Sequence, residues 1–207
     1  QTFKKMKQAV EIFQYNNLPI DYLNLGGGFG IEYDNNKNQL DINKLSILIN
    51  DTYPNPSFKI SIEPGRYLVA QAGYLVTKIL ISKQNGDVNF LITDAGMQTL
   101  LRPAMYNSFH KIIPFNQNGK ETIYTIAGPI CESSDILAKD IKLSFQTKDN
   151  FLIICDVGAY GSTMASNYNS KCLPAEILVN QNEYAVIRDH ENIKTLIDRD
   201  KLPNWKN

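Results

Sequence analysis

Two short loops in the first third of the sequence carry residue types that can hold an anion. The run GGGFG at residues 26–30 lets backbone amides approach a phosphate, because glycine has no Cβ in the way. It has neither the Gly-Lys-Ser/Thr of a Walker loop nor the GxGxxG spacing of a dinucleotide-binding loop. The run EPGR at residues 63–66 combines a carboxylate, which can pair with a cationic ring nitrogen, and a guanidinium, which can grip a phosphate. Each loop taken alone is also compatible with an ordinary surface turn.

The elements around these loops must place them on one face of the protein. Apolar residues at three- and four-residue steps predict a helix over residues 1–17, and an apolar run at 18–25 predicts a strand. Asp41 is a good N-cap for a second helix, and alternating apolar residues at 58–62 predict a second strand. Strands that alternate with helices indicate a parallel sheet, whose chemistry lies in the loops beyond the strand ends. Both loops would therefore lie at the same edge.

The pattern changes after about residue 74, where strand-like runs dominate and helical patterns return only near 162–168 and 191–199. We predict strands at 74–82, 89–93, 122–127, 151–156, 175–179 and 184–189, the last two joined by a hairpin turn. The predicted fold class is therefore α/β plus all-β. Residues 1–73 would form the C-terminal portion of a (β/α)8 barrel, since a complete barrel takes about 250 residues. Residues 74–207 would form a mostly antiparallel β-domain with short helices.

The composition argues against several classes of protein. The chain has 207 residues with 21 basic and 21 acidic side chains, so its formal net charge is zero. Nucleic-acid binders normally carry a basic excess, and a membrane helix needs roughly 18 uninterrupted apolar residues, which the sequence lacks. The cysteines Cys131, Cys155 and Cys172 and the two histidines form no metal-ligand spacing. With no leader visible at Gln1, we expect a cytoplasmic protein without nucleic-acid, membrane or metal partners.

Further segments, taken with the two loops, carry a family resemblance. They are LNLGGGFGI (23–31), SIEPGRYLVAQAGYLV (61–76), TDAGMQTLLRPAMYNSFHKI (93–112), AGPICESSDILAKD (127–140), CDVGAYGSTMASNYNS (155–170) and LPAEILV (173–179). In these segments and their order, the sequence resembles the C-terminal half of the diaminopimelate decarboxylases. These are pyridoxal-phosphate (PLP) enzymes of the alanine-racemase-like, type III fold.

The resemblance implies a cofactor site built from both loops and one residue far downstream. Glu63 would face the pyridine nitrogen of PLP and keep the ring protonated, so that the ring can accept electrons. The PLP phosphate would be held by Gly27, Gly28, Gly65, Arg66 and Tyr160, and Pro64 would belong to the same cofactor-binding loop.

The resemblance also implies a substrate site. Arg102 and Tyr106 would contact the substrate, whose remote carboxylate calls for a bidentate guanidinium, and Glu132 would meet its remote ammonium. Arg66 and Tyr160 would reach the substrate as well. Cys131 would donate the proton to Cα, and in the family this cysteine and its neighbouring acid enter the active site of the partner subunit. We therefore expect a homodimer with shared active sites.

One family feature is absent from the sequence. The lysine that forms the Schiff base with PLP belongs on the first barrel strand, in a segment that we expect upstream of Gln1 or in a separate chain. Lys78 is the least implausible substitute among the lysines present. By itself this chain is expected to be inactive.

The resemblance implies one reaction and leaves alternatives open. The predicted reaction is the PLP-dependent decarboxylation of meso-2,6-diaminopimelate to L-lysine and CO2, a step of lysine biosynthesis. Another type III decarboxylase, acting on ornithine, arginine or carboxynorspermidine, is the nearest alternative. Those substrates mostly lack the remote carboxylate and would leave Arg102 unpaired, which is costly. A non-catalytic homologue that keeps the scaffold is a further alternative. A generic phosphate-binding α/β module would explain the two loops but not the segments of Arg102, Cys131 and Tyr160.

Overall fold

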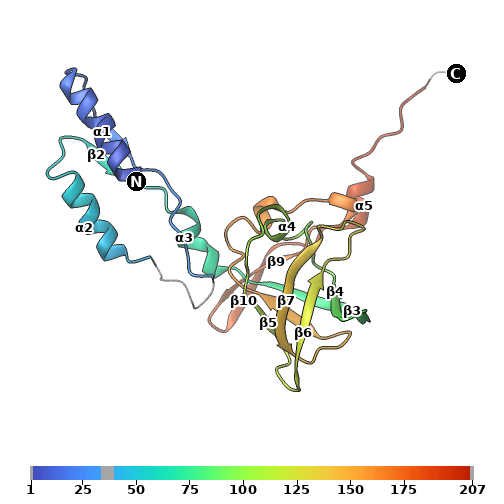
Figure 1. The fold of residues 1–207 in the computed structure, drawn as a ribbon. Helices are drawn as coiled ribbons and strands as arrows, with labels where there is room; N and C mark the ends of the chain where they lie inside the picture. The colour runs from blue at the N-terminus through green and yellow to red at the C-terminus, as the bar shows by residue number, and fades with distance from the viewer. Residues whose placement is uncertain (1, 34–39, 206–207) are drawn as a thin grey trace. The chain divides into compact units, whose positions relative to one another are not determined.

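The computed structural model describes residues 2–33 and 40–205, which divide into two compact units, Gln1–Gln71 and Ala72–Asn207 (Figure 1). None of the helices in the described residues has the length and apolar character needed to cross a membrane.

The first unit follows the predicted alternation of helices and strands. Its elements are α1 (Thr2–Tyr15), β1 (Tyr22–Asn24), α2 (Ile42–Thr52), β2 (Lys59–Ser61), α3 (Gly65–Val69) and the 3₁₀ turn η1 (Ala70–Ala72). The predicted N-cap at Asp41 is confirmed, since its side chain accepts a hydrogen bond from the Lys44 amide at 3.0 Å. Strands β1 and β2 pair in parallel with Leu23 opposite Ile60. A small core of Val10, Leu23, Leu25, Tyr53 and Phe58 holds both helices against the two strands.

The second unit is built around one six-stranded sheet. Its strands are β3 (Leu75–Asn85), β4 (Val88–Thr93), β5 (Ile112–Pro114), β6 (Glu121–Ala127), β7 (Ile136–Ser144) and β8 (Phe151–Ile154), in the spatial order β5-β8-β3-β4-β6-β7. Only β4 and β6 pair in parallel; the other four pairs are antiparallel. The edge strands β5 and β7 approach each other, so the sheet curls into a nearly closed barrel around apolar side chains such as Ile79, Leu91 and Ile126.

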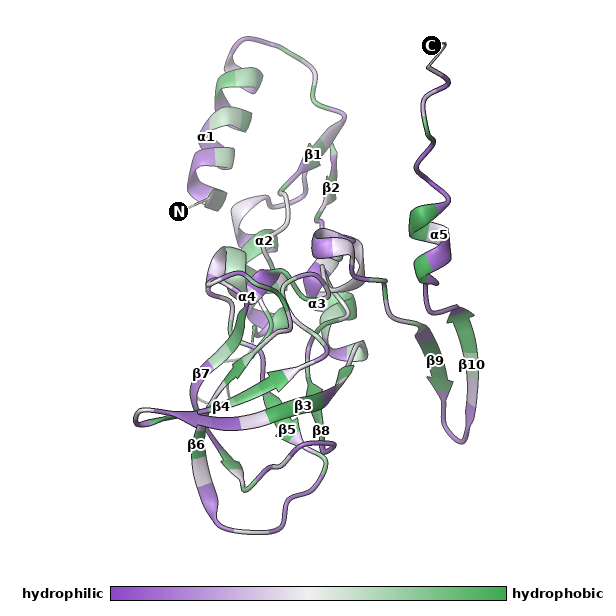
Figure 2. Cartoon of the chain, turned by 90° about the vertical axis from the view of Figure 1, so that its right-hand side faces the viewer, coloured by the Kyte–Doolittle hydropathy of each residue, from purple (hydrophilic) through white to green (hydrophobic). Residues whose placement is uncertain are grey.

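Short helical segments and one hairpin complete this unit. They are α4 (Arg102–Tyr106), η2 (Ser162–Met164), η3 (Tyr168–Ser170), β9 (Glu176–Asn180), β10 (Glu183–Arg188) and α5 (Ile193–Ile197). The predicted hairpin is confirmed, with Asn180 opposite Glu183 across the turn. Figure 2 shows apolar colour along β9 and β10, and the side chains of Leu178, Val179 and Tyr184 are exposed.

The predicted fold class is confirmed: an α/β segment is followed by a mostly antiparallel β part. Strands β5 and β7 and helix α4 were not predicted from the sequence. The complete eight-stranded barrel and the domain boundary at residue 73 stay predictions.

Candidate functional site

The two predicted anion loops lie side by side in the first unit. Because β1 and β2 are parallel, both loops leave the same edge of the pair. The Glu63 amide donates to the Gly26 carbonyl at 2.9 Å, so the loops are joined through their backbones. Gly27 lies so close to the second loop that a Cβ there would be 2.7 Å from the Glu63 carbonyl oxygen. Only glycine fits at this position without moving the backbone.

The Glu63 carboxylate is oriented by a residue that sequence reasoning missed. Asn24, the last residue of β1, donates its side-chain amide to Glu63 Oε1 at 2.6 Å. The carbonyl oxygen of the same Asn24 side chain accepts from the Gly26 amide at 2.8 Å. One side chain therefore fixes both the acid and the start of the glycine loop, and it leaves Glu63 Oε2 for a second donor.

Arg66 lies in the first turn of the short helix α3. Its Nη1 donates to the Tyr33 hydroxyl at 3.4 Å, and its guanidinium carbon is 5.9 Å from the centre of the Tyr33 ring. Its Nε is buried and has no hydrogen-bond partner. A buried donor of this kind normally has an acceptor, so the site fits an anion that supplies one.

Two predicted substrate residues, Tyr106 and Tyr160, lie next to the guanidinium of a third, Arg102, in the second unit. The guanidinium carbon of Arg102 is 5.4 Å from the ring centre of Tyr106 and 5.0 Å from that of Tyr160. Tyr106 is one helical turn beyond Arg102 on α4. Arg102 is half-buried, and its Nε is shielded from solvent without a hydrogen-bond partner. The arrangement is a cation between two aromatic rings with donors left for a carboxylate.

Tyr160 reaches this cluster through an unusual backbone conformation. Its φ of 64° lies in the left-handed region, which costs a non-glycine residue about 1–3 kcal/mol. At the next position, Gly161, a Cβ would overlap the Val157 carbonyl oxygen, so the turn is held tightly.

The loop that carries Cys131 and Glu132 joins β6 to β7 in the same unit. Cys131 is exposed. The Glu132 carboxylate accepts from the Ser134 hydroxyl at 3.1 Å and from the Tyr168 hydroxyl at 3.3 Å. Tyr168 on η3 was not singled out from the sequence.

The remaining candidates have structural surroundings. Lys78 makes an exposed ion pair with Asp149 at 2.7 Å, which lowers the pKa of that carboxyl group. His110 is buried and donates from Nδ1 to the Cys155 carbonyl at 3.0 Å. Burial lowers the pKa of His110, and the positive charge of Arg102 lowers it further. Burial also raises the pKa of the Cys155 thiol, as is typical of a cysteine with a structural role.

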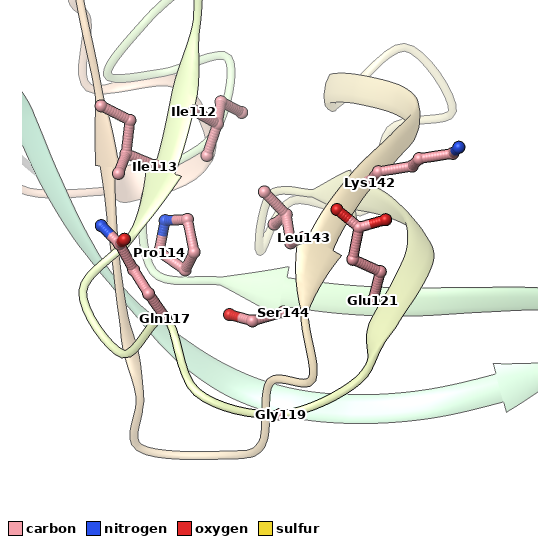
Figure 3. A pocket seen from close by; sticks show the side chains of 9 residues that line it. All are labelled: Ile112, Ile113, Pro114, Gln117, Gly119, Glu121, Lys142, Leu143 and Ser144. Carbon is pink, nitrogen blue, oxygen red and sulfur yellow. The ribbon is translucent and has the colours of Figure 1, made fainter.

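A hollow between the sheet edges of the second unit is lined by other residues. It is lined by β5, the segment before β6 and the end of β7, where the curled sheet does not quite close (Figure 3). None of the predicted site residues lines it.

Comparison with known proteins identifies the family. The sequence model described as pyridoxal-dependent decarboxylase, C-terminal sheet domain, matches residues 33–158, more than half of the chain. The chain belongs to the pyridoxal-dependent decarboxylases. The family resemblance drawn from the sequence is thereby confirmed.

Several relatives of about 35% identity are diaminopimelate decarboxylases. The chain is 35% identical to diaminopimelate decarboxylase of Aquifex aeolicus over 96% of its own length and 47% of the relative. Among solved structures, diaminopimelate decarboxylase of Methanocaldococcus jannaschii superposes with a TM-score of 0.91 at 35% identity, over 98% of this chain and 48% of that one. The Helicobacter pylori enzyme complexed with L-lysine superposes at 0.87 and 31% identity, over 95% and 49%. The chain spans about half the length of the curated relatives it matches.

The predicted site residues of the chain thus form three groups. The loops with Glu63 and Arg66 belong to the unit of residues 1–71. The Arg102 cluster and the Cys131–Glu132 loop belong to the unit of residues 72–207. Their convergence on a single ligand stays a prediction.

Proposed function

We propose that this chain supplies the C-terminal half of a PLP-dependent enzyme that converts meso-2,6-diaminopimelate to L-lysine and CO2. The main support for this proposal is the guanidinium of Arg102, which lies next to the rings of Tyr106 and Tyr160 and has a buried Nε without an acceptor. Diaminopimelate has a second carboxylate remote from the reacting carbon, which a guanidinium can hold with two parallel hydrogen bonds. The names of relatives at about 35% identity support the same substrate.

The residues of the first unit fit PLP. The Gly27–Gly28 and Gly65–Arg66 segments would hold its phosphate, and the buried Arg66 Nε would gain the acceptor it lacks. Glu63, with Oε1 held by Asn24, would present Oε2 to the pyridine nitrogen. PLP, when bound, would supply an electron sink for the decarboxylation at Cα.

The second unit would orient the substrate and handle the proton. Arg102 would fix the remote carboxylate, and Glu132, held by Ser134 and Tyr168, would meet the remote ammonium. After the carbon–CO2 bond breaks, the Cys131 thiol would give its proton to Cα, and the resulting thiolate would regain one from water. Because the Cys131 side chain is exposed, we propose that it serves the site of a partner subunit in a homodimer. We also propose that the enzyme is cytoplasmic.

The test uses the full-length protein, with the sequence that precedes Gln1, loaded with PLP. Release of CO2 from meso-diaminopimelate and from ornithine is measured at matched concentrations. The proposal predicts that kcat/KM for diaminopimelate exceeds that for ornithine by more than about a hundredfold, because ornithine leaves the guanidinium unpaired. A preference for ornithine would instead indicate another type III decarboxylase. Turnover of neither substrate by PLP-loaded protein would indicate a non-catalytic homologue.

A further inference from the structure

Asp135 is a buried carboxylate between two loops of the second unit. It lies just before β7 and is 2% exposed. Its Oδ1 accepts from the Met97 amide at 2.6 Å, and its Oδ2 accepts from the Ile130 amide at 2.9 Å. Its backbone carbonyl also accepts from the Gly128 amide at 2.9 Å. One side chain therefore binds segments that are more than 30 residues apart in sequence.

The two loops are shaped around this carboxylate. A Cβ at Gly96 would lie 2.5 and 2.7 Å from the two carboxylate oxygens, and one at Gly128 would overlap them. Glycine at both positions lets the backbones close on the acid.

Backbone amides hold the charge of Asp135. In the described part of the chain no lysine, arginine or histidine forms an ion pair with it. A buried carboxylate is tolerated only when its oxygens are hydrogen-bonded, and bonds from amides to a charged acceptor are stronger than neutral ones. The acid therefore holds the loops more firmly than a neutral side chain of the same shape would.

Each loop leads directly to a residue of the predicted site. Met97 lies five positions before Arg102, and the Gly96 carbonyl caps the intervening turn by accepting from Leu100, which is 1% exposed. Ile130 immediately precedes Cys131 and is itself buried. The same carboxylate therefore fixes the backbone near the Arg102 guanidinium and the backbone next to the Cys131 thiol.

We propose that Asp135 is a positioning residue that couples the loop before Arg102 to the loop of Cys131 and Glu132. The inference rests on the proposed function for the roles of these residues. In a dimer where the Cys131 loop serves the partner's site, Asp135 connects the guanidinium of one site with the proton donor of the other.

The test compares full-length wild-type protein with Asp135→Asn. The amide keeps one acceptor, but its NH2 faces the second backbone N–H, so one loop loses its bond. We expect hydrogen exchange at Met97 or Ile130 to quicken about ten- to a hundredfold. We also expect the alkylation rate of Cys131 to change and kcat/KM to fall by at least about tenfold. Exchange and alkylation do not depend on turnover, so they remain informative if the proposed reaction is wrong.

A matched control separates positioning from general stability. Gln146→Ala removes a fully buried polar side chain that bonds Asn116 and Ser144 at the far end of β7. It should lower the melting temperature and leave exchange at Met97 and Ile130 at wild-type rates. If Asp135→Asn behaves like this control, the proposal is overturned.

A measurement on wild-type protein covers the case in which Asp135→Asn does not fold. Coupling through one carboxylate predicts that the Met97 and Ile130 amides lose protection together as urea is raised. Loss of protection at clearly different urea concentrations would refute the coupling.

Discussion

Replacing Arg102 with methionine tests whether its guanidinium binds the remote carboxylate of the substrate, on which the substrate assignment depends. Arg102→Met keeps much of the apolar stem between Tyr106 and Tyr160 but removes the charge and both forked donors. Charged hydrogen bonds from a half-buried guanidinium to a carboxylate are together worth about 3 kcal/mol, or roughly a hundredfold in affinity. Lysine in place of Arg102 keeps the charge without the fork and should recover only part of this loss.

The assay isolates the carboxylate by using two inhibitors of the full-length enzyme. L-lysine and cadaverine differ only by one carboxylate, so the ratio of their inhibition constants reports the contact with that group. Arg102→Met should weaken L-lysine about a hundredfold and leave cadaverine within about threefold. Arg188→Met is the matched control, because Arg188 is an exposed partner of Glu176 and should change neither constant. Equal weakening of both inhibitors by Arg102→Met would refute the contact.

Three further substitutions test other parts of the site. Asn24→Ala removes the hydrogen bond to the Glu63 carboxylate and should weaken PLP binding about tenfold in a cofactor titration. An unchanged affinity for PLP would show that Glu63 does not need this hydrogen bond. Tyr168→Phe removes one 3.3 Å hydrogen bond to Glu132 and should raise KM about fivefold with kcat unchanged, and a fall in kcat alone would contradict this role. Burial lowers the pKa of His110 in the folded state, so protonation of this side chain favours unfolding. The contribution of His110 to the free energy of unfolding is therefore fully present above about pH 6.5 and is lost as the pH falls below that value. His110→Gln should flatten this loss in urea titrations between pH 8 and pH 5, and an unchanged profile would assign it to other groups.

The sequence predicted the first unit well because its signals are local. Apolar periodicity, the Asp41 cap and the glycine run each act within a few residues of chain, and the structure follows them. Strand β7 was missed because its alternation breaks at Asp140, whose φ is 53°, where the pairing with β6 also shifts register. Strand β5 has only three residues and ends in Pro114, too short for a periodic signal.

The sequence points to candidate reactive groups, whose roles stay predictions, but not to the groups that orient them. Glu63, Arg102 and Glu132 stand out by residue type within recognisable segments. Their partners are distant in sequence: Asn24 is 39 residues from Glu63, and Tyr168 is 36 residues from Glu132. Such pairs form only when the fold brings their elements together, so neither spacing nor composition can indicate them.

The most direct measurement of the central claim is a crystal structure of the full-length protein with PLP and L-lysine. We expect that Gly28, Arg66 and Tyr160 surround the PLP phosphate and that Arg102 binds the lysine carboxylate through two hydrogen bonds. A structure in which Arg102 points away from the bound lysine, or in which Arg66 does not contact the phosphate, would contradict the account.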